Sequence, residues 1–65
     1  MNKTISPFAN ESESLGIGDL TIENRTDRIS IYGNIDLTRD KAGLEQARLL
    51  KAVLDRVVQI GRAHV

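Results

Sequence analysis

The feature of the sequence that most constrains the fold is a change in the spacing of apolar residues at Leu37. Up to that residue, Ile29, Ile31, Ile35 and Leu37 all stand at odd positions, and most even positions between them are polar. Such alternation is typical of a strand with one face against a core and the other in water. After Leu37, apolar residues recur every three or four positions, which is the period of an α-helix. The chain therefore predicts strands first and a helix second.

The strands are predicted over residues 18–24 and 28–36, and together they form an antiparallel hairpin. Apolar residues are even-numbered in the first strand and odd-numbered in the second, so the numbers of facing residues must have an odd sum. A sum of 51 pairs Ile22 with Ile29, and we favour it for its side-chain pairs. A sum of 53 pairs Ile22 with Ile31 and leaves a longer loop that is easier on the backbone.

Two glycines face each other on the core side if the sum is 51, namely Gly18 and Gly33. One interpretation is a shallow trough that lets the backbone of a helix approach the sheet closely. The other is a β-bulge at Gly33, which would increase the local twist. The sequence leaves both open.

The helix is predicted over residues 39–58, with Thr38 as N-cap and Asp40 in the first turn, where a negative charge complements the helix dipole. Strong helix formers dominate this stretch. Leu49 widens the apolar arc to more than half of the circumference, and a two-stranded ribbon cannot cover so wide an arc. The predicted core consists of Leu20, Ile22, Ile29, Ile31, Ile35, Leu37, Leu44, Leu50, Val53, Leu54, Val57 and Val58.

The predicted fold class is α+β in the order β-β-α. Residues 1–16 are polar and lack a periodic apolar pattern, so we expect a disordered, flexible arm there. Residues 17–58 form the β-β-α module, which we expect to be truncated. An isolated hairpin with one helix is marginally stable. We therefore expect self-association as a homodimer, or packing against a missing C-terminal segment.

The last seven residues, 59–65, read Q-I-G-R-A-H-V. A widely used sequencing adapter, placed after a C and read in the frame CAG-ATC-GGA-AGA-GCA-CAC-GTC, translates to the same heptapeptide. We therefore expect these residues to be adapter read-through and the natural chain to continue beyond Val58. The alternative is an ordinary helix C-terminus, with Gly61 at the C′ position and Arg62 beside the negative end of the dipole.

Composition excludes several kinds of site. The 65 residues include no cysteine, and nine basic residues balance nine acidic ones. Disulfides and thiolate metal sites are therefore excluded, and the basic face of a typical nucleic-acid binder is missing. The only histidine is His64, in the suspect tail. We expect no catalytic, cofactor or metal site. No stretch has the length of a membrane span or the pattern of a signal peptide, which predicts a cytoplasmic location.

These observations favour a non-enzymatic interaction module, which we expect to be a homodimer from a bacterial cytoplasm. Tyr32 is a candidate partner contact because exposed tyrosines often anchor interfaces, although tyrosine is also common in strands. The other candidate contacts belong to the wide apolar arc of the helix, and they are Leu49, Val53, Leu54 and Val57. Two alternatives remain: a small DNA-binding regulator, and a fragment of a larger protein whose functional site is missing.

Overall fold

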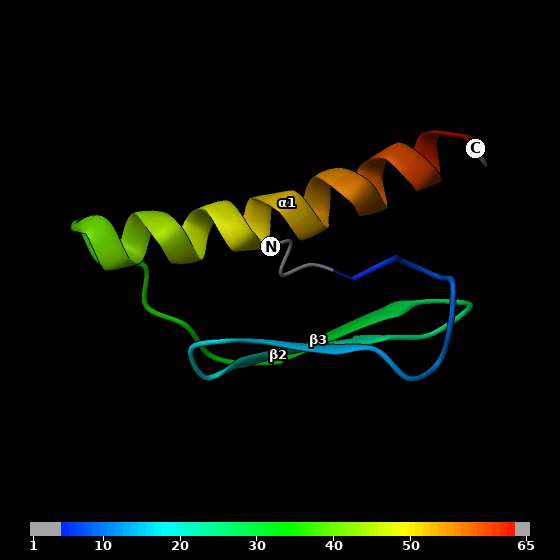
Figure 1. The fold of residues 1–65 in the computed structure, drawn as a ribbon, viewed down its shortest axis with the longest axis horizontal. Coiled ribbons are helices and arrows are strands. Elements are labelled where there is room, and N and C mark those ends of the chain that lie inside the picture. Colours follow the sequence, from blue (N-terminus) through cyan, green and yellow to red (C-terminus); the bar gives the residue numbers. More distant parts are fainter. Residues whose placement is uncertain (1–4, 64–65) are drawn as a thin grey trace.

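A computed structural model describes residues 5–63, and it confirms the α+β class with an antiparallel hairpin followed by one helix. The elements are β1 (Ser14–Ile17), β2 (Leu20–Asn24), β3 (Ile29–Gly33) and α1 (Lys41–Ala63). The strands form one antiparallel sheet in the order β1-β2-β3. The helix lies along one face of this sheet (Figure 1), and β1 is the strand that its backbone approaches most closely.

The first strand, β1, lies partly inside the stretch that was predicted to be a flexible arm. It pairs with β2 so that Leu15 faces Ile22 and Ile17 faces Leu20. The strand has only four residues, too few to display a clear alternation. The arm prediction is therefore wrong for residues 14–16. Residues 5–13 contain no helix or strand, and residues 1–4 lie outside the described part.

The turn from β1 to β2 explains why the second strand begins later than predicted. Ile17 and Leu20 face each other, so Gly18 and Asp19 form a two-residue loop. Gly18 has a φ of 59°, and glycine with positive φ at the first loop position is typical of a type II′ hairpin turn. Gly18 therefore belongs to a turn and not to the strand predicted over residues 18–24.

The register between β2 and β3 has a sum of 53, so the favoured sum of 51 is wrong. Ile22 faces Ile31, and the last pair of the ladder is Asn24 with Ile29, which leaves a four-residue loop from Arg25 to Arg28. Within this loop the Arg25 N–H donates to the Arg28 carbonyl at 3.0 Å. A sum of 51 would leave Arg25 and Thr26 as the loop. Both residues carry a Cβ, which disfavours the positive φ of the turns that fit such loops. The strain of the shorter loop outweighs its better side-chain pairs.

Gly33 ends β3 instead of extending it to residue 36. Its φ is 102°, and a Cβ on this residue would clash with the backbone oxygen of Asp19. Gly33 faces Leu20 in the sheet, so the predicted pairing of Gly33 with Gly18 is wrong. The close backbone approach at Gly33 is to the β1–β2 turn and not to the helix.

The helix begins at Lys41 because Asp40, and not Thr38, is its N-cap. The Asp40 Oδ1 accepts the N–H of Gly43 at 2.9 Å and the hydroxyl hydrogen of Thr38 at 2.6 Å. The first hydrogen bond inside the helix runs from the Leu44 N–H to the Asp40 carbonyl at 3.0 Å. This arrangement is that of an N-cap aspartate.

The far end of the helix passes beyond the predicted end at residue 58. It continues through Gly61 to Ala63, so Gly61 does not stand at a C′ position. The origin of residues 59–65 stays a prediction.

The core lies between α1 and the β1–β2 half of the sheet. Its buried apolar residues are Ile5, Ile17, Leu20, Ile22 and Val53. Partly buried residues around the core cluster are Leu15, Ile29, Ile35, Leu49, Leu50 and Val57. Five predicted core residues are exposed instead, namely Ile31, Leu37, Leu44, Leu54 and Val58. The N-terminal segment and β1 supply much of the cover that the wide helical arc seemed to require from a partner.

Candidate interaction surface

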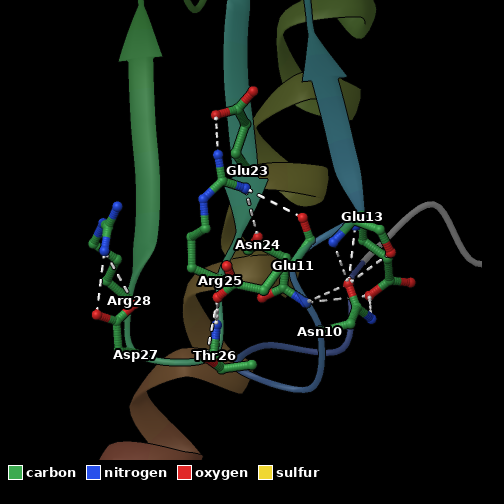
Figure 2. A network of polar contacts seen from close by, with 10 residues as sticks. Asn10, Glu11, Glu13, Glu23, Asn24, Arg25, Thr26, Asp27 and Arg28 are labelled. Atoms are coloured by element: carbon green, nitrogen blue, oxygen red, sulfur yellow. Dashed lines mark hydrogen bonds and ion pairs between the residues drawn. The ribbon is translucent and has the colours of Figure 1, made fainter.

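A buried asparagine joins the N-terminal segment, residues 5–13, to the end of β2. Asn24 has no exposed surface. Its side-chain oxygen accepts the N–H of Phe8 at 2.9 Å, and its amide nitrogen donates to the Ser6 carbonyl at 2.8 Å. Its main-chain N–H donates to the Glu13 carbonyl at 2.9 Å. Figure 2 shows Asn24 within the polar network that surrounds it. These hydrogen bonds let a polar side chain be buried without a large penalty.

The part of the segment that Asn24 binds is a tight turn that begins at Ser6. The Ala9 N–H donates to the Ser6 carbonyl at 3.1 Å, Pro7 follows Ser6, and Phe8 has a φ of 67°. Proline followed by a residue of positive φ is the pattern of a type II turn. A left-handed conformation costs a residue with a Cβ about 1–2 kcal/mol. The hydrogen bond from Phe8 to Asn24 helps to offset that cost.

Two carboxylates hold the same segment from its other end. The Glu13 Oε1 accepts the Ser6 N–H at 2.9 Å and an Asn10 amide hydrogen at 3.2 Å, and these bonds lower the pKa of Glu13. The Glu11 Oε2 accepts the N–H of Thr26 at 2.9 Å and its hydroxyl at 3.0 Å. The bond from the Thr26 N–H is the main reason that the pKa of Glu11 is lowered. Both groups therefore stabilise the fold in their ionised form.

The polar network around Asn24 fastens the N-terminal segment to β2, and we call it the clasp. Its donors and acceptors are directed at one another, and no buried side-chain nitrogen or oxygen in residues 5–63 lacks a hydrogen-bond partner. Those residues also contain no group of three His, Cys, Asp or Glu that could hold a metal ion. We call the side of the molecule that carries β1, the N-terminal segment and this clasp the closed side.

Away from the closed side, the molecule leaves large apolar side chains in water. Their exposed fractions range from 42% to 55%. We call this set the open apolar surface, and it consists of Ile31, Leu37, Leu44, Leu54 and Val58. Large apolar side chains left in water in such numbers on a small protein commonly mark an interaction site.

The helical members of the open apolar surface lie away from the closed side. Arg56 is near enough to Glu13 for its charge to help lower the pKa of that carboxyl, so the Arg56 side of α1 faces the N-terminal segment. At about 100° per residue, Val53 lies about 60° round the helix from Arg56, and Leu54 and Val58 lie about 160–200° round. Val53 is fully buried. Leu54, about 100° from Val53, therefore projects sideways from the core, away from the closed side. Val58 and Leu44 lie about 140° and 180° from Val53 and point away from the sheet.

The predicted partner contacts fall into three groups. Tyr32 and Leu54 are exposed, by 51% and 42%, and remain candidates. Leu49 and Val57 are half-buried against the core. Val53 has no exposed surface, so its side chain cannot reach a partner in the folded chain. It occupies the centre of the apolar arc, which is the part that the sheet covers.

Tyr32 lies on the polar face of the sheet, opposite to the helix. It faces Thr21 across the β2–β3 ladder. A hydrogen bond with the Glu23 carboxylate raises the pKa of the tyrosine, and Glu23 also pairs with Arg25 at 3.2 Å. Successive side chains of a strand point to opposite faces. Tyr32 and its neighbour Ile31 therefore belong to different surfaces.

All five residues of the open apolar surface were predicted from the sequence to lie in the core. The spacing of Ile31, Leu44 and Val58 identified them as apolar positions on regular elements. Spacing does not say how far a neighbouring element extends over each position. The signal that pointed to this surface was the excess width of the helical arc beyond what a hairpin covers.

Several basic side chains are neutralised by nearby carboxylates. The ion pairs are Arg25–Glu23 at 3.2 Å, Arg28–Asp27 at 3.1 Å and Lys51–Asp55 at 2.8 Å. A phosphate backbone is recognised by cations that release its counterions, and cations already paired contribute less. These pairs therefore give no support to the DNA-binding alternative.

Comparisons of the chain with protein-family models, with curated proteins and with solved structures gave no match. The described residues also contain no helix with the length and apolar character needed to cross a membrane. Inference about function therefore rests on the surface described above.

Proposed function

We propose that this chain is a small, non-enzymatic interaction module that forms a homodimer through the open apolar surface. The observation that carries the proposal is the contrast between Val53 and Leu54, adjacent residues of α1. The first is fully buried and the second is 42% exposed, so the apolar arc of the helix extends beyond the edge of its own core. A partner that covers Leu54 would complete that core.

The accessible surface of the chain supports the same proposal. The chain exposes 4881 Å² for a mass of 7.2 kDa. A compact monomer of that mass exposes about 4100 Å². The excess of about 800 Å² means that this fold covers less of its own surface than a typical monomer of that mass.

A second copy of the chain also suits this surface electrostatically. The net charge is zero, so two copies approach each other without overall repulsion. Charged residues of both signs flank this surface, as Asp55 and Arg62 do beside Val58.

Light scattering coupled to size-exclusion chromatography, over a concentration series, tests the proposal. We expect a mass of twice 7.2 kDa at high concentration and a shift toward the monomer on dilution. Leu54→Glu should weaken the dimer by at least about tenfold because it buries a charge in the interface. The control is Ala52→Glu, which adds the same charge at an exposed position on the other side of α1. A single mass of 7.2 kDa at every concentration would contradict the proposal.

A further inference from the structure

The strand β3 has a free edge whose backbone groups point away from the sheet. Within residues 5–63, β3 pairs only with β2. The Arg25 N–H donates to the Arg28 carbonyl, and hydrogen-bonded pairs alternate along an antiparallel ladder. Ser30 and Tyr32 therefore direct their backbone N–H and C=O toward β2. The other three residues of β3 direct their backbone N–H and C=O outward, away from β2. They are Ile29, Ile31 and Gly33.

The other ladder agrees with this assignment. The Asn24 N–H donates to the Glu13 carbonyl, which turns the backbone of Asn24 toward β1 and away from β3. Asn24 faces Ile29 in the β2–β3 ladder. Asn24 and Ile29 therefore form a pair that exchanges no backbone hydrogen bonds. The hydrogen-bonded pair next to it, Arg25 with Arg28, requires the same, because hydrogen-bonded and non-hydrogen-bonded pairs alternate.

The free edge of β3 lacks the features that usually prevent strands from pairing. Natural edge strands carry lysine, proline, inward-pointing charges or bulges. The sequence of β3 is I-S-I-Y-G, which contains no lysine, no proline and no charged residue. The outer strand on the closed side differs, because the residues of β1 that direct their backbone outward are Ser14 and Gly16. Neither residue has an apolar side chain that an added strand would cover.

The sequence of β3 is compatible with pairing to its own copy. In an antiparallel pair centred on Ile31, Ile31 faces the second copy's Ile31, Ile29 faces Gly33, and Ser30 faces Tyr32. Outward-directed residues then meet outward-directed residues at all three positions, which is the condition for a continuous hydrogen-bonded ladder. No charged residue within the strand faces another.

We propose that two copies of this chain join by pairing their β3 strands about a two-fold axis at Ile31. The two three-stranded sheets then form one continuous sheet of six strands with both helices on the same face. This proposal rests on the homodimer proposed above and specifies its geometry. It is isologous, as a two-fold interface must be. It also brings the exposed Ile31 side chains of both copies together, on the side of the sheet where Leu54 projects from each helix.

Amide hydrogen exchange measured by NMR at low and high protein concentration tests the geometry. In the dimer, the N–H groups of Ile29, Ile31 and Gly33 should exchange roughly tenfold more slowly or better. Those of Ser30 and Tyr32 should be protected at both concentrations, because they bond to β2 within one copy. A dimer in which the three outward amides still exchange rapidly overturns the β3 pairing but leaves the homodimer in place. A chain that remains monomeric overturns both proposals.

Cysteine cross-linking provides a second readout. The chain has no cysteine, so Ile31→Cys introduces the only thiol. A hydrogen-bonded pair of antiparallel residues has a Cα separation of about 5.5 Å, within the range of a disulfide. We expect mild oxidation to convert Ile31→Cys into a covalent dimer. The matched control, Ser14→Cys, places a thiol on the outer strand of the closed side and should not cross-link above background. Cross-linking of Ser14→Cys but not of Ile31→Cys would overturn the choice of edge.

Discussion

Facing residues on the central strand and on one outer strand of this sheet differ sharply in burial. Ile22 and Ile31 face each other across the β2–β3 ladder, yet the first is fully buried and the second is 46% exposed. On the β1 side, the N-terminal segment and α1 close over the core, and Asn24 secures that closure. On the β3 side, Ile31 lies partly in water, and within residues 5–63 no strand pairs with the outer edge of β3.

The difference shows that burial depends on the amount of covering structure as well as on hydrophobicity. The covering structure of this chain is one helix and one N-terminal segment, and both serve the closed side. Burial also varies along β3, because Ile29 packs against the core cluster whereas Ile31 is 46% exposed. The experiments that follow test how strongly the two sides differ.

The largest expected effect comes from truncating each isoleucine of the facing pair. Ile22→Ala removes a buried side chain and should lower the free energy of unfolding by about 2–5 kcal/mol. Ile31→Ala should lower it by about 1 kcal/mol or less in dilute solution, because that side chain is already half in water. Urea denaturation followed by circular dichroism measures both. Equal losses would show that the two sides do not differ in the monomer.

A smaller effect is expected from removing the clasp. Asn24→Ala leaves the Phe8 N–H and the Ser6 carbonyl without their partner and should lower the free energy of unfolding by about 1–3 kcal/mol. The control, Asn34→Ala, changes an exposed residue and should alter it by less than about 0.5 kcal/mol. The same denaturation measurement compares them. If Asn24→Ala were as mild as its control, the clasp would not secure the closed side.

The mildest test lowers the pH. The pKa of Glu13 is below its ordinary value of 4.5 in the folded chain, so its ionised form stabilises the fold above about pH 4.5 and that contribution is lost as the pH falls through the folded pKa. Glu11 behaves in the same way. NMR signals of residues 5–13 should therefore lose amide protection in acid before those of β3.

Glu13→Gln isolates the contribution of that carboxylate, because it keeps an oxygen acceptor and removes the titration. We expect this variant to flatten the pH dependence, whereas Glu45→Gln, on the exposed side of α1, should retain it. Loss of protection in β3 before residues 5–13 would reverse the assignment of the acid-sensitive side.

The elements with long periodic patterns were predictable from the sequence, and the short ones were not. Alternation around Ile29 and Ile31 predicted β3, and the later three-to-four spacing predicted α1. β1 is too short to show a period, and Ile5 is an isolated apolar residue that is nevertheless 3% exposed. Ile5 precedes a hydrogen-bonded turn in which Ser6 is bound by Asn24, eighteen positions further along the chain, and no local pattern encodes that contact.

The candidate surface was predictable in composition but not in extent. The width of the helical arc indicated that the helix needs more cover than a hairpin provides, and Leu54 was correctly placed on an apolar position. Val53, its neighbour, was proposed for the same role and lies in the core. One residue along a helix changes the direction of a side chain by about 100°. Only the position of the sheet decides which of the two is covered.

The connections within the sheet also bear on how the chain reaches this structure. β1 and β2 are joined by two residues and β2 and β3 by four, so every strand meets the one next to it in sequence. Ordering such short loops costs little entropy, and proteins dominated by local contacts fold fast. The sheet and its clasp involve only residues up to Gly33. The strands can therefore pair before α1 packs on them, and the core closes when Val53 of α1 covers Ile17 and Ile22.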